Sequence, residues 1–106
     1  MEFQALIQRA LAVRHQYAAW ETRQYGRTWS REEVLQGFVG DVGDLVKLAM
    51  AYSGIRNVPH VEQKLAHELA DCLWSLLVLA ELYNVDLESA FLLTMTELEQ
   101  HITLPG

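Results

Sequence analysis

Two pairs of carboxylates, each spaced by one helical turn, are the residues of this sequence best suited to chemistry. Asp41 and Asp44 form the first pair, and Glu68 and Asp71 form the second. Side chains three positions apart point the same way from an α-helix, so both members of a pair can reach one ligand. Hard divalent cations such as Mg²⁺ and Mn²⁺ prefer sites made of oxygen atoms. The spacing therefore indicates a metal site shared by two helices.

Both pairs lie in stripes of apolar residues. On a helical wheel of roughly 100° per residue, four apolar residues fall within about 60° of Asp41: Val34, Phe38, Leu45 and Leu48. The stripe around Glu68 contains Val61, Leu65, Cys72, Ser75, Leu79 and Leu82. A buried, unpaired carboxylate is costly and takes up a proton or a cation. One such pair alone is more often a solvated helix face, but two pairs in apolar stripes favour a site.

The elements that must position these pairs are helices. Apolar periodicity predicts an all-α, single domain over residues 1–106, with helices at about 3–22, 30–52, 61–83 and 86–101. Ser30 and Glu33 have the spacing of a capping box, and Gly54 and Pro59 mark a loop. Leu6, Ile7, Leu11 and Ala18 are the expected inward face of the first helix. A ferritin-like di-iron site needs Glu-x-x-His motifs, which the sequence lacks.

The amino-acid composition limits which binding partners and which cellular compartment the protein can have. The net charge is −6 and no basic block occurs, which argues against a nucleic-acid partner. The longest nearly uncharged stretch, residues 72–80, is far shorter than the roughly 20 residues of a membrane span. The first residues do not have the pattern of a secretory signal, and the single cysteine cannot form an intrachain disulfide. We therefore expect a cytoplasmic protein that does not contact membranes.

Two segments of the sequence resemble the MazG-like, all-α nucleoside triphosphate pyrophosphohydrolases. The string VGDVGDL, residues 39–45, is similar to the family's VGEVGEL. The string HELADCLWSLLVLAELYNVDLESAF, residues 67–91, is similar to its EELADVLIYLLRLA and GIDLEEA segments. The likeness covers roughly residues 20–91, and it matches the family signature of E-x-x-E, a spacer and E-x-x-D.

The resemblance implies an activity and a set of roles. All four carboxylates would be catalytic ligands of Mg²⁺, with Mn²⁺ as a possible substitute. The family hydrolyses a nucleoside triphosphate between the α and β phosphates, which serves nucleotide-pool housecleaning. Trp20 lies where dCTP-hydrolysing relatives have an aromatic residue beside the base. The family's fold also implies a homodimer, with a tetramer as the alternative. Trp74 and Leu77, on the back of the third helix, are expected to be covered by the second copy.

The sequence departs from the family pattern in two places. The first pair is Asp-x-x-Asp instead of Glu-x-x-Glu, so each of these ligands is one methylene shorter. The family's phosphate-gripping K-M-x-x-N pattern is missing, so Lys47 and Lys64 become the expected phosphate ligands, with Arg56 as a further cation. Lys64 could equally form an ordinary ion pair with Glu68. The alternative function is a catalytically weakened or inactive dimer that binds nucleotide and metal.

Overall fold

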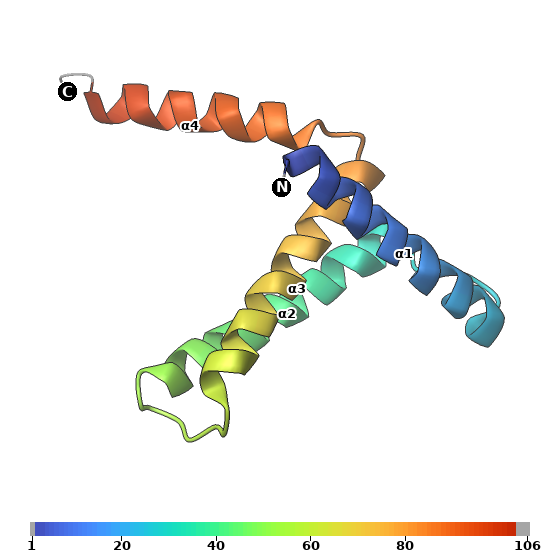
Figure 1. Ribbon diagram of the computed structural model, residues 1–106, viewed down its shortest axis with the longest axis horizontal. Helices are drawn as coiled ribbons and strands as arrows, with labels where there is room; N and C mark the ends of the chain where they lie inside the picture. Colours follow the sequence, from blue (N-terminus) through green and yellow to red (C-terminus); the bar gives the residue numbers. More distant parts are fainter. Residues whose placement is uncertain (1, 104–106) are drawn as a thin grey trace.

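The computed structural model describes residues 2–103, which form four α-helices and no strand (Figure 1). The helices are α1 (Phe3–Tyr25), α2 (Arg31–Tyr52), α3 (Val61–Leu82) and α4 (Leu87–Thr103). This confirms the predicted all-α fold, and each helix ends within three residues of its predicted limit. None of the helices described here is both long enough and apolar enough to cross a bilayer.

Local sequence signals explain where the helices begin and end. The Ser30 hydroxyl accepts a hydrogen bond from the Glu33 backbone N–H (3.2 Å), and the Glu33 carboxylate accepts one from the Ser30 N–H (3.1 Å). This is the predicted capping box at the start of α2. Gly26 closes α1 in the left-handed conformation (φ 78°), which glycine adopts without strain. Asp86 caps α4 by accepting from the backbone N–H three residues on.

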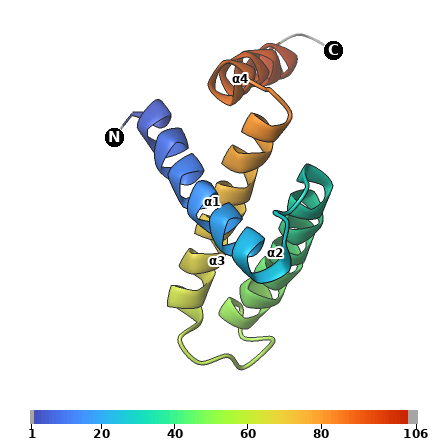
Figure 2. The same cartoon turned by 90° about the vertical axis from the view of Figure 1, so that its right-hand side faces the viewer.

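The antiparallel pair α2 and α3 is the main packing unit, and α1 crosses α3 (Figures 1 and 2). Its buried core consists of Val34, Val78 and Leu79, with Phe38, Trp74 and Leu82 packed around them. Among the described residues, no large side chain is completely buried. The α2–α3 pair therefore positions the carboxylates with only a small apolar core to hold it together.

Helix α1 covers the back of α3, where a second copy of the chain was expected. Leu77 is only 4% exposed and shares a groove with Ile7 and Leu11 of α1. The indole N–H of Trp74 donates to the backbone carbonyl of Ala10 (3.1 Å). For Leu77 the prediction of contact with a second copy is therefore wrong, because α1 of the same chain already covers this side chain. Trp74 is half-buried, and its contact with a second copy remains a prediction. The inward face of α1 also differs from the prediction, since Ala10 and Glu21 are buried and Leu6 is exposed.

The described chain is more open than a compact monomer. Helix α4 extends away from the other helices and buries none of its residues (Figure 1). The radius of gyration is 17.1 Å, whereas a compact domain of 100 residues has about 13 Å. The accessible surface is 8111 Å², whereas a folded monomer of this mass exposes about 6,000 Å². The chain thus exposes about 2,000 Å² more than its size requires.

Candidate metal centre and adjoining cavity

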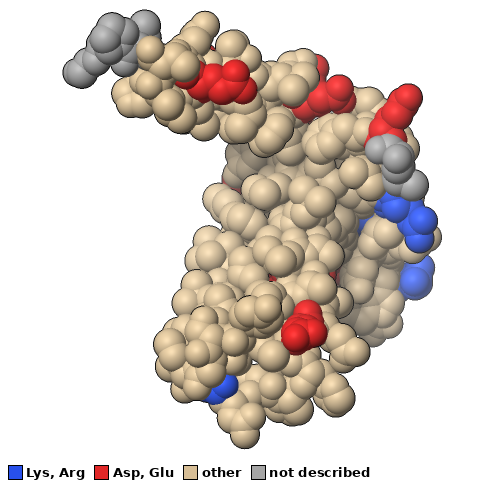
Figure 3. Space-filling view, turned by 60° about the vertical axis from the view of Figure 1, so that its left-hand side comes forward, with Lys and Arg blue, Asp and Glu red and all other residues tan. Residues whose placement is uncertain are grey.

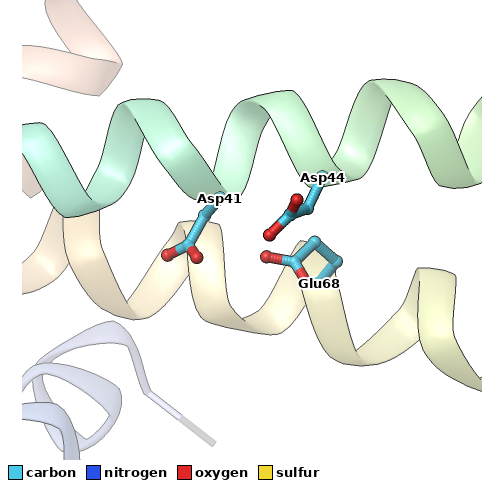
Figure 4. Close-up of side chains that lie close together, drawn as sticks. All are labelled: Asp41, Asp44 and Glu68. Carbon is cyan, nitrogen blue, oxygen red and sulfur yellow. The ribbon is translucent and has the colours of Figure 1, made fainter.

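Three of the four predicted carboxylates converge between α2 and α3. Asp41 and Asp44 extend from α2 and Glu68 from α3, and their carboxylates point toward one another (Figure 4). One oxygen of each lies within 4.8 Å of the others. Ligand oxygens around one divalent cation are about 3 to 5 Å apart, because each lies about 2.0–2.6 Å from the ion. The three side chains can therefore hold a metal ion.

Glu68 is the member of this group that most needs a cation. Its Oε1 atom is buried and accepts no hydrogen bond from any residue that the structure describes. Burial raises the pKa of Glu68, and the charges of Asp41, Asp71 and Asp44 raise it further. A buried acceptor without a partner is rare in folded proteins and calls for an explanation. A cation beside Oε1 would supply the missing partner and offset the repulsion.

Asp71, the fourth predicted ligand, has a different partner in this structure. Its Oδ2 atom lies 3.1 Å from Nε2 of His67, one turn earlier on α3. It is not one of the three clustered carboxylates, although its charge still raises the pKa of Glu68. The His67 side chain is 74% exposed. Coordination of a metal by Asp71 remains a prediction.

A cavity of about 770 Å³ adjoins the carboxylates. Five aromatic side chains, from α1, α3 and the turn before α2, line it: Tyr17, Trp20, Tyr25, Trp29 and Trp74. They include two pairs in contact, with ring centroids 5.5 Å and 5.7 Å apart. Asp41 and Asp71 also line the cavity. Asp41 therefore belongs both to the carboxylate group and to the wall of an aromatic cavity. Trp20 lines the same cavity, and its place beside a base remains a prediction.

The predicted phosphate ligands do not reach this cavity. Lys47 lines a separate cavity of about 500 Å³ beside Arg56, near the loop between α2 and α3. Lys64 is exposed, is not among the residues lining the aromatic cavity, and forms no ion pair with Glu68 within residues 2–103. The cations that do line the cavity are Arg14 and Arg27.

Sequence reasoning missed these two arginines because neither belongs to a carboxylate motif or to the last helix. One signal was available, since Arg14 and Glu21 are seven residues apart and therefore share a face of α1. Arg27 lies in the turn before α2, where no spacing rule identifies a ligand.

Comparison of the chain with protein-family models, curated protein sequences and solved structures found no match. The functional argument accordingly depends on the chemistry of the site. Carboxylates that hold a cation can bind the phosphates of an anionic ligand through that cation. Aromatic side chains beside them can stack on a planar ring of the same ligand.

Proposed function

We propose that this protein is a Mg²⁺-dependent, MazG-like nucleoside triphosphate pyrophosphohydrolase, which converts a (d)NTP and water to a (d)NMP and pyrophosphate. The observation that carries the proposal is the double position of Asp41, in the carboxylate group and in the wall of the aromatic cavity. A ligand that spans both places needs a planar ring at one end and metal-bound anionic groups at the other. A nucleoside triphosphate has this construction, and Mn²⁺ is a plausible substitute for Mg²⁺.

The proposal gives the side chains separate tasks. Asp41, Asp44 and Glu68 would hold the cation, which would offset the net charge of −6 toward an anionic ligand. Mg²⁺ bound there would supply Lewis-acid chemistry, which polarises a phosphoryl oxygen and lowers the pKa of a water molecule. Asp71 faces the cavity beside His67 and is placed to accept a proton. Trp20 stacks on the base.

The proposal includes a homodimer. The surplus of about 2,000 Å² of surface matches the amount that one chain buries in a large obligate interface, of roughly 2,000–5,000 Å² in total. Figure 3 shows a face of the molecule on which uncharged side chains predominate and charged ones are sparse. Helix α4 exposes five large apolar side chains: Phe91, Leu92, Leu93, Leu98 and Ile102. Exposed apolar surface on this scale is typical of a protein interface.

A second function, binding of nucleotide and metal without turnover, is favoured by one observation. Both cations along the described part of the cavity are already paired, Arg14 with Glu21 and Arg27 with Glu33. Lys47 and Lys64 lie elsewhere. Phosphoryl transfer relies on cations that stabilise charge in the transition state. A site whose bound metal is its main unpaired cation could bind a triphosphate and hydrolyse it slowly or not at all.

The test is a pyrophosphate-release assay over the eight common (d)NTPs, with Mg²⁺ and with Mn²⁺. Wild type is compared with Asp41→Asn, which keeps the shape of the side chain and removes its charge. Release by wild type that is lost in the variant supports the hydrolase. An increase in melting temperature with Mg²⁺, without release from any (d)NTP, supports the binding protein. If neither cation changes the melting temperature and nothing is released, both functions are refuted.

A further inference from the structure

A buried ion pair on α1, with several further hydrogen bonds, forms part of the wall of the aromatic cavity. Glu21 is a charged residue that is only 6% exposed, and the side chain of Arg14 is 12% exposed. The Nη1 atom of Arg14 lies 3.5 Å from both carboxylate oxygens of Glu21, two helical turns away. An ion pair this deeply buried persists only where further hydrogen bonds satisfy its remaining atoms.

Those further bonds all go to the turn between α1 and α2. Glu21 Oε1 accepts from the Thr28 hydroxyl (2.8 Å) and from the Trp29 backbone N–H (2.9 Å). Arg14 Nη2 donates to the Thr28 hydroxyl (3.2 Å) and to the Trp29 backbone carbonyl (2.9 Å). Both backbone polar groups of Trp29 are therefore held by two side chains of α1. The backbone of Trp29 is therefore held in place by hydrogen bonds that do not involve its own side chain.

The indole of Trp29 then lies against α2. A Cβ atom added to Gly37 would be 3.1 Å from Cζ3 of the Trp29 ring, closer than such contacts normally allow. The ring therefore occupies the space that a side chain at position 37 would take. Gly37 is one turn before Asp41 on the same face of α2, and all three residues line the cavity. The indole therefore lies beside Gly37, one helical turn from Asp41 of the carboxylate group.

We infer that Arg14 and Glu21 are positioning residues, which hold Trp29 as a fixed wall of the cavity and so define the space for the planar ring of a ligand. This inference deepens the proposed function and rests on it. Arg14 and Glu21 also line the cavity, but they are hydrogen-bonded to each other and to the turn that carries Trp29. The pair therefore acts on the stacked part of the ligand through the position of one indole. A pair that served only to stabilise the turn would not discriminate between ligands with and without a ring.

Equilibrium binding of two probes tests this difference. One probe is the Mg²⁺ complex of an α,β-methylene (d)NTP, chosen among the analogues of the eight common (d)NTPs as the one that wild type binds most tightly. The other is Mg²⁺–tripolyphosphate, which has the phosphates and no ring. Trp29→Ala should weaken the nucleotide analogue by about 5- to 150-fold, the range measured for loss of one stacking contact on a base. Tripolyphosphate should be affected less than twofold.

Glu21→Ala should reproduce part of this selective loss. It should add nothing in the Trp29→Ala background, because both changes act through the same indole. Gly37→Ala provides an independent variant. Alanine favours a helix more than glycine does, so any loss of analogue binding cannot come from unfolding of α2. Ser30→Ala is the matched control, since it removes the adjacent N-cap bond without touching the Trp29 backbone.

Selective weakening of the analogue by Glu21→Ala and Gly37→Ala, but not by Ser30→Ala, supports the inference. Equal weakening of both probes, or unchanged analogue binding in Trp29→Ala, overturns it and leaves the proposed function standing. If wild type binds neither probe in Mg²⁺, the proposed function fails and the inference fails with it. If Glu21→Ala does not fold, Glu21→Gln, which keeps the shape of the side chain and removes its charge, takes its place.

Discussion

Replacement of Glu68 by glutamine should raise the stability of the metal-free protein. It should also abolish the further stabilisation that Mg²⁺ gives to wild type. In wild type, Glu68 has two carboxylate neighbours, Asp41 and Asp44, with oxygens within 4.8 Å. Two like charges at this distance repel by about 0.9 kcal/mol in a water-like medium and by about 3.5 kcal/mol at an effective dielectric constant of 20. Asp44 is exposed and the others are half-buried, so the smaller figure is the better guide.

Removal of the charge therefore relieves about 2 kcal/mol of repulsion over the two pairs. The amide is also neutral, so the cost of burying a charged oxygen at the Oε1 position is avoided. For a domain of this size, 1 kcal/mol shifts the melting temperature by roughly 4–8 °C. We expect the melting temperature of metal-free Glu68→Gln to exceed that of wild type by on the order of 10 °C.

Added metal should reverse this order. A cation that binds only the folded state stabilises it by about 2.7 kcal/mol when its concentration is 100 times its dissociation constant. Wild type should gain this stabilisation from Mg²⁺ and Glu68→Gln should not. Thermal melts at pH 8, with EDTA and with Mg²⁺, measure both effects. Glu62→Gln is the control, because Glu62 is an exposed glutamate of the same helix and is not part of the carboxylate group. Equal or lower stability of metal-free Glu68→Gln would refute the reasoning.

Three further predictions follow from the same structure. The metal-free protein should become more stable as the pH falls from 8 toward 4.5, because burial raises the folded-state pKa of Glu68 and the folded protein holds that proton more tightly than the unfolded chain. Below pH 4.5 stability should fall, because the ion pair with Arg27 lowers the pKa of Glu33 to about 2 and protonation of Glu33 removes the stability that this pair contributes. Thermal melts from pH 8 to pH 2 show whether stability has a maximum near pH 4.5. Leu98→Glu, in the middle of the exposed apolar face of α4, should convert a dimer to monomers in sedimentation at micromolar concentration, whereas Gln100→Glu should not; a monomeric wild type would contradict this. Asp71→Asn should weaken Mn²⁺ binding by a few-fold and Glu68→Gln by about tenfold or more, since only Glu68 is in the converging group; titration followed by electron paramagnetic resonance gives both constants, and an equal loss in the two variants would place Asp71 among the metal ligands.

The helices and most of the site could be predicted from the sequence because their causes are local. A period of 3.6 residues, a capping box at Ser30 and a left-handed glycine at position 26 act within a few residues of the chain. The convergence of Asp41, Asp44 and Glu68 follows from two such helices turning their apolar stripes toward each other. Helical spacing alone is sufficient to place these side chains on facing sides.

The remaining features depend on contacts between segments that are distant in the sequence, or on competition between neighbours. The helical wheel placed Asp71 beside Glu68. It could not show whether the Asp71 carboxylate would join the metal site or pair with His67, one turn earlier on the helix. It also left the back of α3 without a partner, because nothing in the sequence shows that Trp74 meets the carbonyl of Ala10, 64 residues away. The hydrogen bond from the Trp29 backbone N–H to Glu21 spans only eight residues, but it depends on the path of the turn after α1, which no helical pattern predicts.

The position of the carboxylates connects the site to the stability of the fold. Along the α2–α3 pair they lie between two apolar layers. The buried cluster around Val34 and Val78 is on one side, and half-buried Leu45 and Leu65 are on the other. Both layers draw the helices together, while three like charges between them push the helices apart. A cation at this point would turn that repulsion into attraction. Metal binding and helix packing therefore act on the same interface, and loss of the metal should loosen α2 from α3 before it affects the contact of α1 with α3.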